Sequence, residues 1–305
     1  MPSLQRRRFL AGTIAFIASS KYALSDPAGD GGAMPPPRGP MRRRAAPVAV
    51  GDSCALPLQV HAPLPVIPAS VNGRTYLFGV DTGAMGFARV SGELVHECHL
   101  EQAGIARMSD PSGKHPQDVA VFRLASLALG AVHFGELDAE QESHLPNGVS
   151  GLLGLDLFEG FVLGFDRKAG RLSLTRGELP SADGKHRFQS PPAPALRLPV
   201  SVADQRFSAD IDTGQAICPL LVTPDWAVRL GLQQDASLST AGRTVSQTLA
   251  TSIAPNSRIV TAGETTLAVD RIGWPTPTPA PNLGWQAFAG LHLELDRRNN
   301  RCRLS

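Results

Sequence analysis

The chain has 305 residues, of which 42% are hydrophobic, 18% charged and 6% aromatic, a balance typical of a soluble globular protein with room for two domains. Its 30 glycines and 26 prolines favour short strands joined by turns over long helices. The net charge of +2 is small, and the sequence has no basic patch interleaved with aromatic residues, so composition argues against a nucleic-acid partner.

Residues 1–25 are predicted to be an export signal. Three arginines at 6–8 precede Phe9 and an apolar run to Ser20, and their order resembles a twin-arginine signal. The run, about a dozen residues long, is too short to span a bilayer as a helix. We therefore expect an exported bacterial protein, periplasmic or secreted, with an uncleaved membrane anchor as the alternative. Removal of the four positive charges in this segment leaves a net charge of −2.

Two segments rich in proline divide the rest of the chain. Residues 26–50, rich also in glycine and arginine, lack apolar periodicity and are predicted to be a flexible linker. Residues 177–194 are predicted to link two lobes, which are expected at 51–176 and 195–305.

The first lobe is predicted to be mostly strand. A strand ending at Val71 turns through Asn72-Gly73 into a second strand that ends at Asp81. Residues 90–106 are predicted to be helical. Further on, residues 119–129 and 132–134 are predicted to form a long hairpin around Gly130, and residues 162–165 to turn through 168–170 into a strand at 171–174.

The motif Asp-Thr-Gly occurs twice, in "FGVDTGAM" from Phe78 and in "SADIDTGQA" from Ser208. One copy alone is most simply a turn, but two copies in matching contexts indicate a shared cause. Asp81 and Asp212 are 131 residues apart, and residues 153–174 align with 283–304 at an offset of 130, with nine of 22 positions identical. The chain therefore contains a duplicated domain of about 115 residues.

The duplication predicts an all-β fold of two homologous β-barrel-like lobes with pseudo-twofold symmetry. An approximate twofold axis brings equivalent strand ends together, so Asp81 and Asp212 are expected to face each other. Because both halves of this pair lie in one chain, a monomer is sufficient for one active site.

Two facing carboxylates have a definite chemistry. They share one proton over a broad pH range. One then acts as a general base on water and the other as a general acid toward a carbonyl oxygen, which hydrolyses an amide without metal, cofactor or covalent intermediate. Thr82 and Thr213 are placed to hydrogen-bond across the interface, while Gly83 and Gly214 let backbone N–H groups approach the carboxylates.

These features resemble the pepsin and retropepsin group of aspartic proteases over residues 54–305. Each Asp-Thr-Gly follows an apolar strand and precedes an apolar-Gly segment by about 70 residues. The resemblance implies the acid-protease architecture and an aspartic-type endopeptidase that acts on polypeptides. It assigns catalysis to Asp81 and Asp212, and support to Thr82, Gly83, Thr213, Gly214, Leu153, Gly154, Leu283 and Gly284.

The same resemblance predicts flaps over an extended peptide. One is the hairpin between about Met108 and Leu124, and a weaker counterpart lies between 244 and 260. Neither contains tyrosine, which is a departure from the family.

Three further residues bear on the expected activity: one in each Asp-Thr-Gly loop and one in the second supporting segment. Ala84 lacks a hydroxyl that could donate to its carboxylate, which is expected to displace activity toward milder acidity. Gln215 is bulky and would either reach the pair or crowd it. Asn282 stands where an apolar residue is usual.

Two alternatives to the protease stay open. Gln215 and Asn282 favour a catalytically weak or inactive peptide-binding protein on the same fold. The other alternative is a structural pair of β domains whose Asp-Thr-Gly segments are only turns.

The cysteines and histidines indicate no metal site. The grouped residues His96-Glu97-Cys98-His99 are predicted to be an exposed helix face. An even number of cysteines in an oxidising compartment permits two disulfides in three connectivities among Cys54, Cys98, Cys218 and Cys302.

Overall fold

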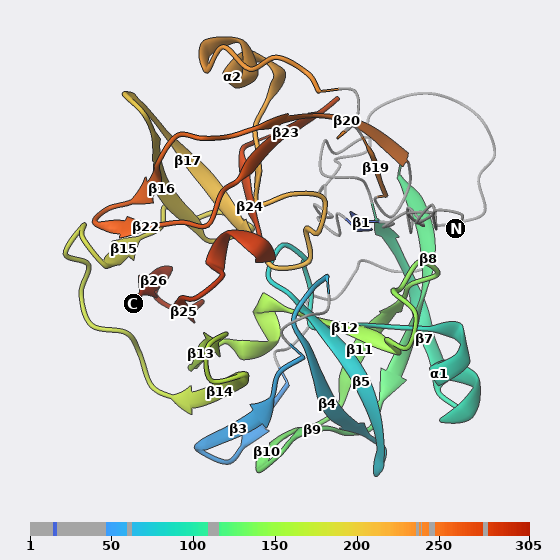
Figure 1. Cartoon of the computed structure of the whole chain (residues 1–305). Helices are drawn as coiled ribbons and strands as arrows, with labels where there is room; N and C mark the ends of the chain where they lie inside the picture. Colours follow the sequence, from blue (N-terminus) through green and yellow to red (C-terminus); the bar gives the residue numbers. More distant parts are fainter. Residues whose placement is uncertain are drawn as a thin grey trace, which may run out of the picture.

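The computed structural model describes residues 15–16, 47–59, 63–108, 116–235, 238, 240–243, 248–276 and 280–305. Within these ranges strands dominate (Figure 1), and the helices are α1 (Gly92–Glu97), α2 (Pro224–Arg229) and the 3-10 turns η1 (Leu155–Phe158) and η2 (Trp285–Phe288). No helix in these ranges is long and apolar enough to cross a bilayer. The predicted all-β class is confirmed.

The first lobe is built on a ten-stranded sheet, counted over the described residues. Its strands are, in order across the sheet, β2 (Ala49–Val50), β10 (Val132–Phe134), β9 (Leu127–Leu129), β4 (Val66–Val71), β5 (Arg74–Asp81), β12 (Gly151–Gly154), β6 (Ala88–Val90), β11 (Leu137–Gln141), β8 (Gln117–Leu124) and β7 (Glu101–Met108). The hairpin of β4 and β5 turns at Asn72 and Gly73, both with positive φ, as the sequence predicts.

The second lobe repeats this sheet. Its order is β22 (Thr265–Thr266), β21 (Val260–Ala262), β16 (Arg197–Val202), β17 (Gln205–Asp212), β24 (Asn282–Gly284), β18 (Leu220–Leu221), β23 (Arg271–Pro275), β20 (Thr248–Pro255), β19 (Thr240–Arg243) and β1 (Ala15–Phe16). Apart from β1 and β2, each strand has a counterpart at the same place in the other sheet. The two halves of the sequence therefore fold to the same topology.

A third sheet joins the lobes (Figure 1). Its strands are, in order, β15 (Arg187–Gln189), β26 (Arg301–Leu304), β25 (His292–Asp296), β13 (Phe161–Asp166), β14 (Arg171–Arg176) and β3 (Ser53–Pro57). β13 pairs antiparallel with β25, and Gly164 lies opposite Glu294, its own equivalent at an offset of 130. Two equivalent residues can face each other only on the symmetry axis, so the pseudo-twofold axis passes between these strands.

The hydrophobic core is continuous across this joint. Leu163 and Leu295 face each other in the shared sheet, and both are fully buried. The main apolar cluster contains buried side chains from both ten-stranded sheets as well as from the shared one. Burial of apolar surface therefore holds the lobes in a fixed relation.

Two predicted elements of the first lobe are wrong in part. The helix expected over residues 90–106 is only α1, because His99 adopts a positive φ of 48° and the chain then continues as β7. The long hairpin expected around Gly130 is only β9 with β10, since β8 pairs instead with β7 and β11. Both errors come from long-range pairing that overrides local pattern.

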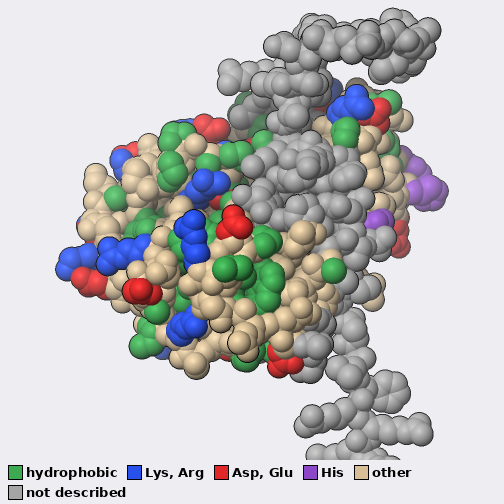
Figure 2. Space-filling model, turned by 90° about the horizontal axis from the view of Figure 1, so that it is seen from above, with side chains coloured by type: hydrophobic (Ala, Val, Ile, Leu, Met, Phe, Trp, Pro, Cys, Tyr) green, Lys and Arg blue, Asp and Glu red, His purple; other side chains and the backbone are tan. Residues whose placement is uncertain are grey.

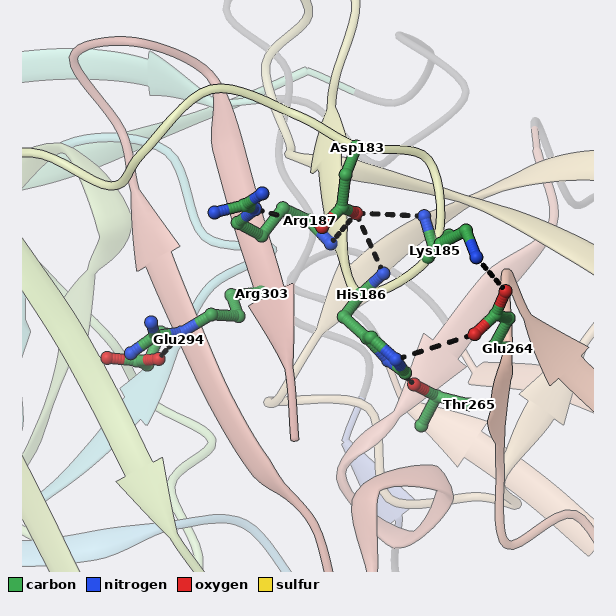
Figure 3. Close-up of polar contacts among 8 residues, drawn as sticks. All are labelled: Asp183, Lys185, His186, Arg187, Glu264, Thr265, Glu294 and Arg303. Atoms are coloured by element: carbon green, nitrogen blue, oxygen red, sulfur yellow. Dashed lines mark hydrogen bonds and ion pairs between the residues drawn. The ribbon is translucent and has the colours of Figure 1, made fainter.

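The segment at 177–194 contributes β15 and is fastened to the second lobe. The Asp183 carboxylate accepts hydrogen bonds from the backbone N–H groups of Lys185, His186 and Arg187 at 2.9, 3.0 and 2.8 Å (Figure 3). The Lys185 ammonium then lies 2.7 Å from the Glu264 carboxylate, in the turn between β21 and β22. The turn at residues 183–187 is thus ordered by hydrogen bonds, and a surface ion pair links it to the second lobe.

Several predicted features lie outside the described residues. Of the export signal, only β1 is described, and it pairs parallel with β19. The predicted flaps are described as the paired arms β7–β8 and β19–β20, without residues 109–115 and 244–247.

On the face seen in Figure 2, the described acidic and basic side chains lie interspersed among polar and apolar ones.

Candidate active site

The two Asp-Thr-Gly motifs meet between the lobes. β5 ends at Asp81 and β17 ends at Asp212, and both side chains are 0% exposed. A Cβ placed on Gly83 would lie 2.4 Å from Asp212 Cγ, and one on Gly214 would lie 2.3 Å from Asp81 Cγ. Each glycine therefore lies against the carboxyl of the opposite motif, in space that only a residue without a side chain leaves free.

The threonines of the motifs lock the loops together. The backbone N–H of Thr82 donates to Thr213 Oγ1 at 3.1 Å, and that of Thr213 donates to Thr82 Oγ1 at 3.0 Å. The Thr82 hydroxyl donates onward to the Ile211 carbonyl at 2.8 Å, and the Thr213 hydroxyl to the Val80 carbonyl at 2.6 Å. All four bonds are buried and cross between the lobes, so they hold the two strand ends at a fixed separation.

Each carboxylate is held by its own loop in the same way. Asp81 Oδ1 accepts from the backbone N–H groups of Gly83 and Ala84, both at 3.0 Å. Asp212 Oδ1 accepts from the equivalent groups of Gly214 and Gln215, both at 3.1 Å. The Oδ1 atoms of the two carboxylates are therefore held in the same way.

The Oδ2 atoms of the two carboxylates are not equivalent. Asp212 Oδ2 accepts from the Asn282 side-chain amide at 2.8 Å. Asp81 Oδ2 is buried and accepts from no N–H group within the described ranges, and the Asp81 side chain is hydrogen-bonded to the Asp212 carboxyl. At the place that Asn282 takes in the second lobe the first lobe has Leu152, whose side chain has no group that could donate to Asp81.

The electrostatics of Asp81 follow from this burial. Burial raises the pKa of Asp81 well above the usual range of an aspartate, and the nearby Asp212 carboxyl raises it further, while Arg89 opposes the rise. Two carboxyls this close titrate as a pair.

The predicted supporting segments, in β12 and β24, pair with the strands that end in the two Asp-Thr-Gly loops. Leu153 and Leu283 are fully buried at the centre of each sheet. The backbone N–H of Gly154 donates to the Phe87 carbonyl at 3.0 Å, and that of Gly284 to the Pro219 carbonyl at 2.9 Å. Each segment therefore braces its own loop by backbone hydrogen bonds, and all ten predicted site residues gather in one place.

The Gln215 side chain makes its hydrogen bonds within its own loop. Its amide nitrogen donates to the Cys218 carbonyl at 2.7 Å, and its amide oxygen accepts from the N–H groups of Ile217 and Cys218 at 2.6 and 3.1 Å. These bonds close the loop on itself. The Gln215 side chain therefore supports the conformation of this loop.

Sequence reasoning missed a buried charge cluster beside the first motif. Arg89 is 1% exposed and lies 3.3 Å from the Glu142 carboxylate, with Glu140 opposite it in the pairing of β6 and β11. A charged residue inside the short apolar segment "ARV" was the available signal. Its charge bears on Asp81, as noted above.

The described residues contain no cluster of metal ligands and no disulfide. Within the described part of the chain, no group of three or more His, Cys, Asp or Glu side chains is arranged to hold a metal ion. All four cysteines are free thiols, and burial raises the pKa of Cys218 and Cys302 to about 12. The His96-Glu97-Cys98-His99 group lies at the end of α1, where both histidines are exposed.

Comparison with known proteins fits this site. A family model described as aspartyl protease matches residues 67–157, which confirms the resemblance drawn from the sequence. No curated protein is matched by the sequence. Among solved structures, an aspartic proteinase from Irpex lacteus is similar with a TM-score of 0.49 and 13% identity, over 83% of this chain and 97% of that chain, a likeness too distant to bear on function.

We predict that Gly83→Ala destabilises the fold. The added methyl would lie 2.4 Å from Asp212 Cγ, closer than any ordinary contact, and overpacking of this kind costs about 1–3 kcal/mol. Urea unfolding measures the change. Gly104→Ala is the matched control, because a Cβ there meets open space. Equal stability of the two variants would contradict the close approach of the motifs.

We also predict that Asp81→Asn becomes increasingly stabilising, relative to the parent protein, as pH rises. Because the folded state raises the pKa of Asp81, the stability linked to its protonation is complete below the unfolded value of about 3.9 and is lost as pH rises toward the folded one. Asparagine does not ionise, so the variant does not lose this stability as pH rises. Thermal midpoints of both proteins between about pH 4 and 7 measure the difference.

Asp183→Asn is the control of opposite sign. Backbone N–H groups, that of Arg187 first, lower the pKa of Asp183, so its stabilising contribution is present at neutral pH and is lost on acidification. Asp183→Asn should therefore be destabilising at neutral pH and neutral in strong acid. A pH-independent gap between Asp81→Asn and the parent would contradict a raised pKa.

Proposed function

We propose that this chain, whose residues 67–157 belong to the aspartyl protease family, is an endopeptidase in which Asp81 and Asp212 hydrolyse peptide bonds with an activated water. One observation carries this proposal. Reciprocal threonine hydrogen bonds hold two buried carboxyl groups against each other at the junction of two equivalent lobes. Ordinary turns would require neither the threonines nor the cross-lobe contact.

The chemistry uses one proton shared by the pair. The ionised member takes a proton from water as the water oxygen attacks the carbonyl carbon, and the protonated member gives its proton to the carbonyl oxygen. The resulting tetrahedral diol then loses its amine: the first carboxyl returns a proton to the nitrogen, the second takes one from a hydroxyl, and the C–N bond breaks. The products are an acid and an amine, and the pair regains its starting state.

An extended polypeptide is the substrate class that suits the fold. Paired strand arms, β7–β8 and β19–β20, flank the lobes at equivalent places. Strand edges recognise extended peptides through backbone hydrogen bonds. Export to the periplasm or beyond is part of the proposal and is supported by the twin-arginine-like N-terminus.

The contacts of Gln215 and Asn282 favour the proposed protease over the competing peptide-binding function. Gln215 and Asn282 suggested a second half unfit for catalysis. The Gln215 side chain instead bonds to its own loop, and Asn282 donates to Asp212. Both carboxyls keep the environment that the proposed chemistry needs.

We expect Asp81→Asn and Asp212→Asn each to abolish peptide cleavage, with rates lowered by at least about 100-fold, because each removes the acid or the base. Digestion of a broad peptide library between about pH 3 and 8, read by mass spectrometry, measures this. Asp183→Asn, an exposed aspartate far from the pair in sequence, should cleave normally. If the parent protein binds peptides and cleaves none, the peptide-binding function replaces the protease.

We further expect the alkaline limb of the pH-rate profile to lie above the ordinary aspartate range, since burial raises the pKa of Asp81. Ala84→Ser supplies a hydroxyl donor next to Asp81 and should move that limb to lower pH. Ala84→Cys is the control, being close in size but a weak donor. A parent profile that peaks at about pH 2, or an unmoved limb in Ala84→Ser, would contradict this expectation.

A further inference from the structure

Asn282 breaks the symmetry of the carboxyl pair. The four backbone N–H groups that hold Asp81 and Asp212 are matched in kind, and their distances differ by 0.1 Å, from 3.0 to 3.1 Å. Among the described residues, the Asn282 side-chain amide donates to Asp212 Oδ2 at 2.8 Å, and the Asp81 carboxyl has no equivalent amide contact. No described N–H group donates to Asp81 Oδ2, and the side-chain hydrogen bond of Asp81 is to the Asp212 carboxyl. N–H groups therefore donate to both oxygens of Asp212 and to one oxygen of Asp81.

The pairing of β24 with β17 places this amide. The strands run parallel, with Asn282 opposite Asp210 and Gly284 opposite Asp212. Since alternate residues of a strand share a face, Asn282 lies on the side of the sheet that carries the Asp212 carboxyl. In the first lobe the same place is taken by Leu152, which packs with Leu64 and Val66.

An asparagine at this position has an energetic cost. Asn282 is 8% exposed, and its Oδ1 is buried with no hydrogen-bond partner in the described ranges. A buried acceptor without a partner destabilises a fold, and the equivalent leucine shows that an apolar side chain fits there. The donor contact to Asp212 is what this residue adds in return.

Other charged groups near the pair do not reproduce this effect. On β6, Arg89 acts on Asp81, but it is paired with Glu142 and lies opposite Glu140 of β11. On β17 itself, Asp210 is paired with Arg197 of β16 at 2.6 Å. These charges are offset by their partners, whereas the Asn282 donor contacts the carboxylate directly.

We propose that Asn282 is a positioning residue that keeps the negative charge of the pair on Asp212, so that the shared proton resides on Asp81. A neutral N–H donor stabilises a carboxylate and offers nothing to a protonated oxygen that must itself donate. This inference rests on the proposed function and assigns its roles.

The roles in hydrolysis follow from this assignment. Asp212 takes the proton from water, and Asp81 gives its proton to the carbonyl oxygen. After the tetrahedral diol forms, Asp212 returns a proton to the leaving nitrogen, and Asp81 takes one from a hydroxyl as the C–N bond breaks. The cycle ends with the proton again on Asp81, and Asn282 takes no proton at any step.

Asn282→Leu tests the assignment by installing the side chain that the first lobe uses. Without the amide, the singly ionised pair loses stabilisation relative to the doubly protonated pair, so the acid limb of the pH-rate profile should move up by about one unit. The alkaline limb should stay in place, because Asp212 is ionised on both sides of that step. The active pH range therefore narrows from the acid side.

Leu152→Val is the matched control. It changes packing at the equivalent place of the first lobe, where no side chain donates to a carboxylate. Both limbs should keep their positions in this variant, whatever its rate. Asn282→Gln keeps the amide on a longer side chain and should recover part of the acid-limb position.

A second readout does not depend on turnover. In protein labelled with ¹³C at the aspartate carboxyl carbons, and assigned with the Asp81→Asn and Asp212→Asn variants, the chemical shifts report which carboxyl carries the proton. At pH 5 we expect Asp212 ionised and Asp81 protonated in the parent, and a less complete charge separation in Asn282→Leu.

The outcomes separate cleanly. If Asn282→Leu lowers the rate and leaves both limbs of the pH-rate profile in place, Asn282 has only a structural role. If the alkaline limb moves instead of the acid limb, the proton resides on Asp212. Either result overturns the proposal. If the parent cleaves no peptide, the proposed function fails, and the carboxyl shifts still decide whether Asn282 localises the charge.

Discussion

The structure depends on the buried hydrogen bonds between Thr82 and Thr213. Each threonine accepts from the other's backbone and donates to a carbonyl of the other lobe, so neither loop is complete alone. Such bonds contribute only about 0.5–1.5 kcal/mol each, but an unmade buried one costs more. The lock therefore holds two carboxyl groups together although their proximity is itself unfavourable. The shared sheet and the continuous core provide the stability that offsets this cost.

The two lobes repeat a topology but differ in the side chains around their carboxyl groups. Backbone hydrogen bonds and glycine contacts are the same on both sides, because they follow from the strand order and the motif. The side chains around them have diverged. The first lobe places a buried Arg89 cluster near its carboxyl, and the second places Gln215 and Asn282 around its own. A reaction that needs one acid and one base benefits from such a difference, since two identical sites would leave the proton unassigned.

Prediction from sequence succeeded where a feature was local or duplicated. The Asn72-Gly73 hairpin and the turn from β13 into β14 depend on residues close in sequence. The repeat of Asp-Thr-Gly, with its constant offset, was enough to place Asp81 opposite Asp212. It failed over residues 90–106, where apolar spacing fits a helix, because β7 is recruited as a strand by β8 across the sheet. It also misjudged Gln215, because side-chain bonds within a loop leave no periodic pattern.

The sequence by itself determined the class of fold, the duplication and the two carboxylates, since these depend on residue types and spacing along the chain. Only the tertiary structure decided how the carboxylates differ. The amide of Asn282 is 70 residues from Asp212 in the chain and 2.8 Å from it in space, a contact created by the parallel pairing of β24 with β17. The same asparagine, which departs from an otherwise apolar segment in the sequence, donates a side-chain hydrogen bond to one member of the pair in the fold. Hydrogen bonds act over a few ångströms, so their partners are fixed by packing and not by sequence order.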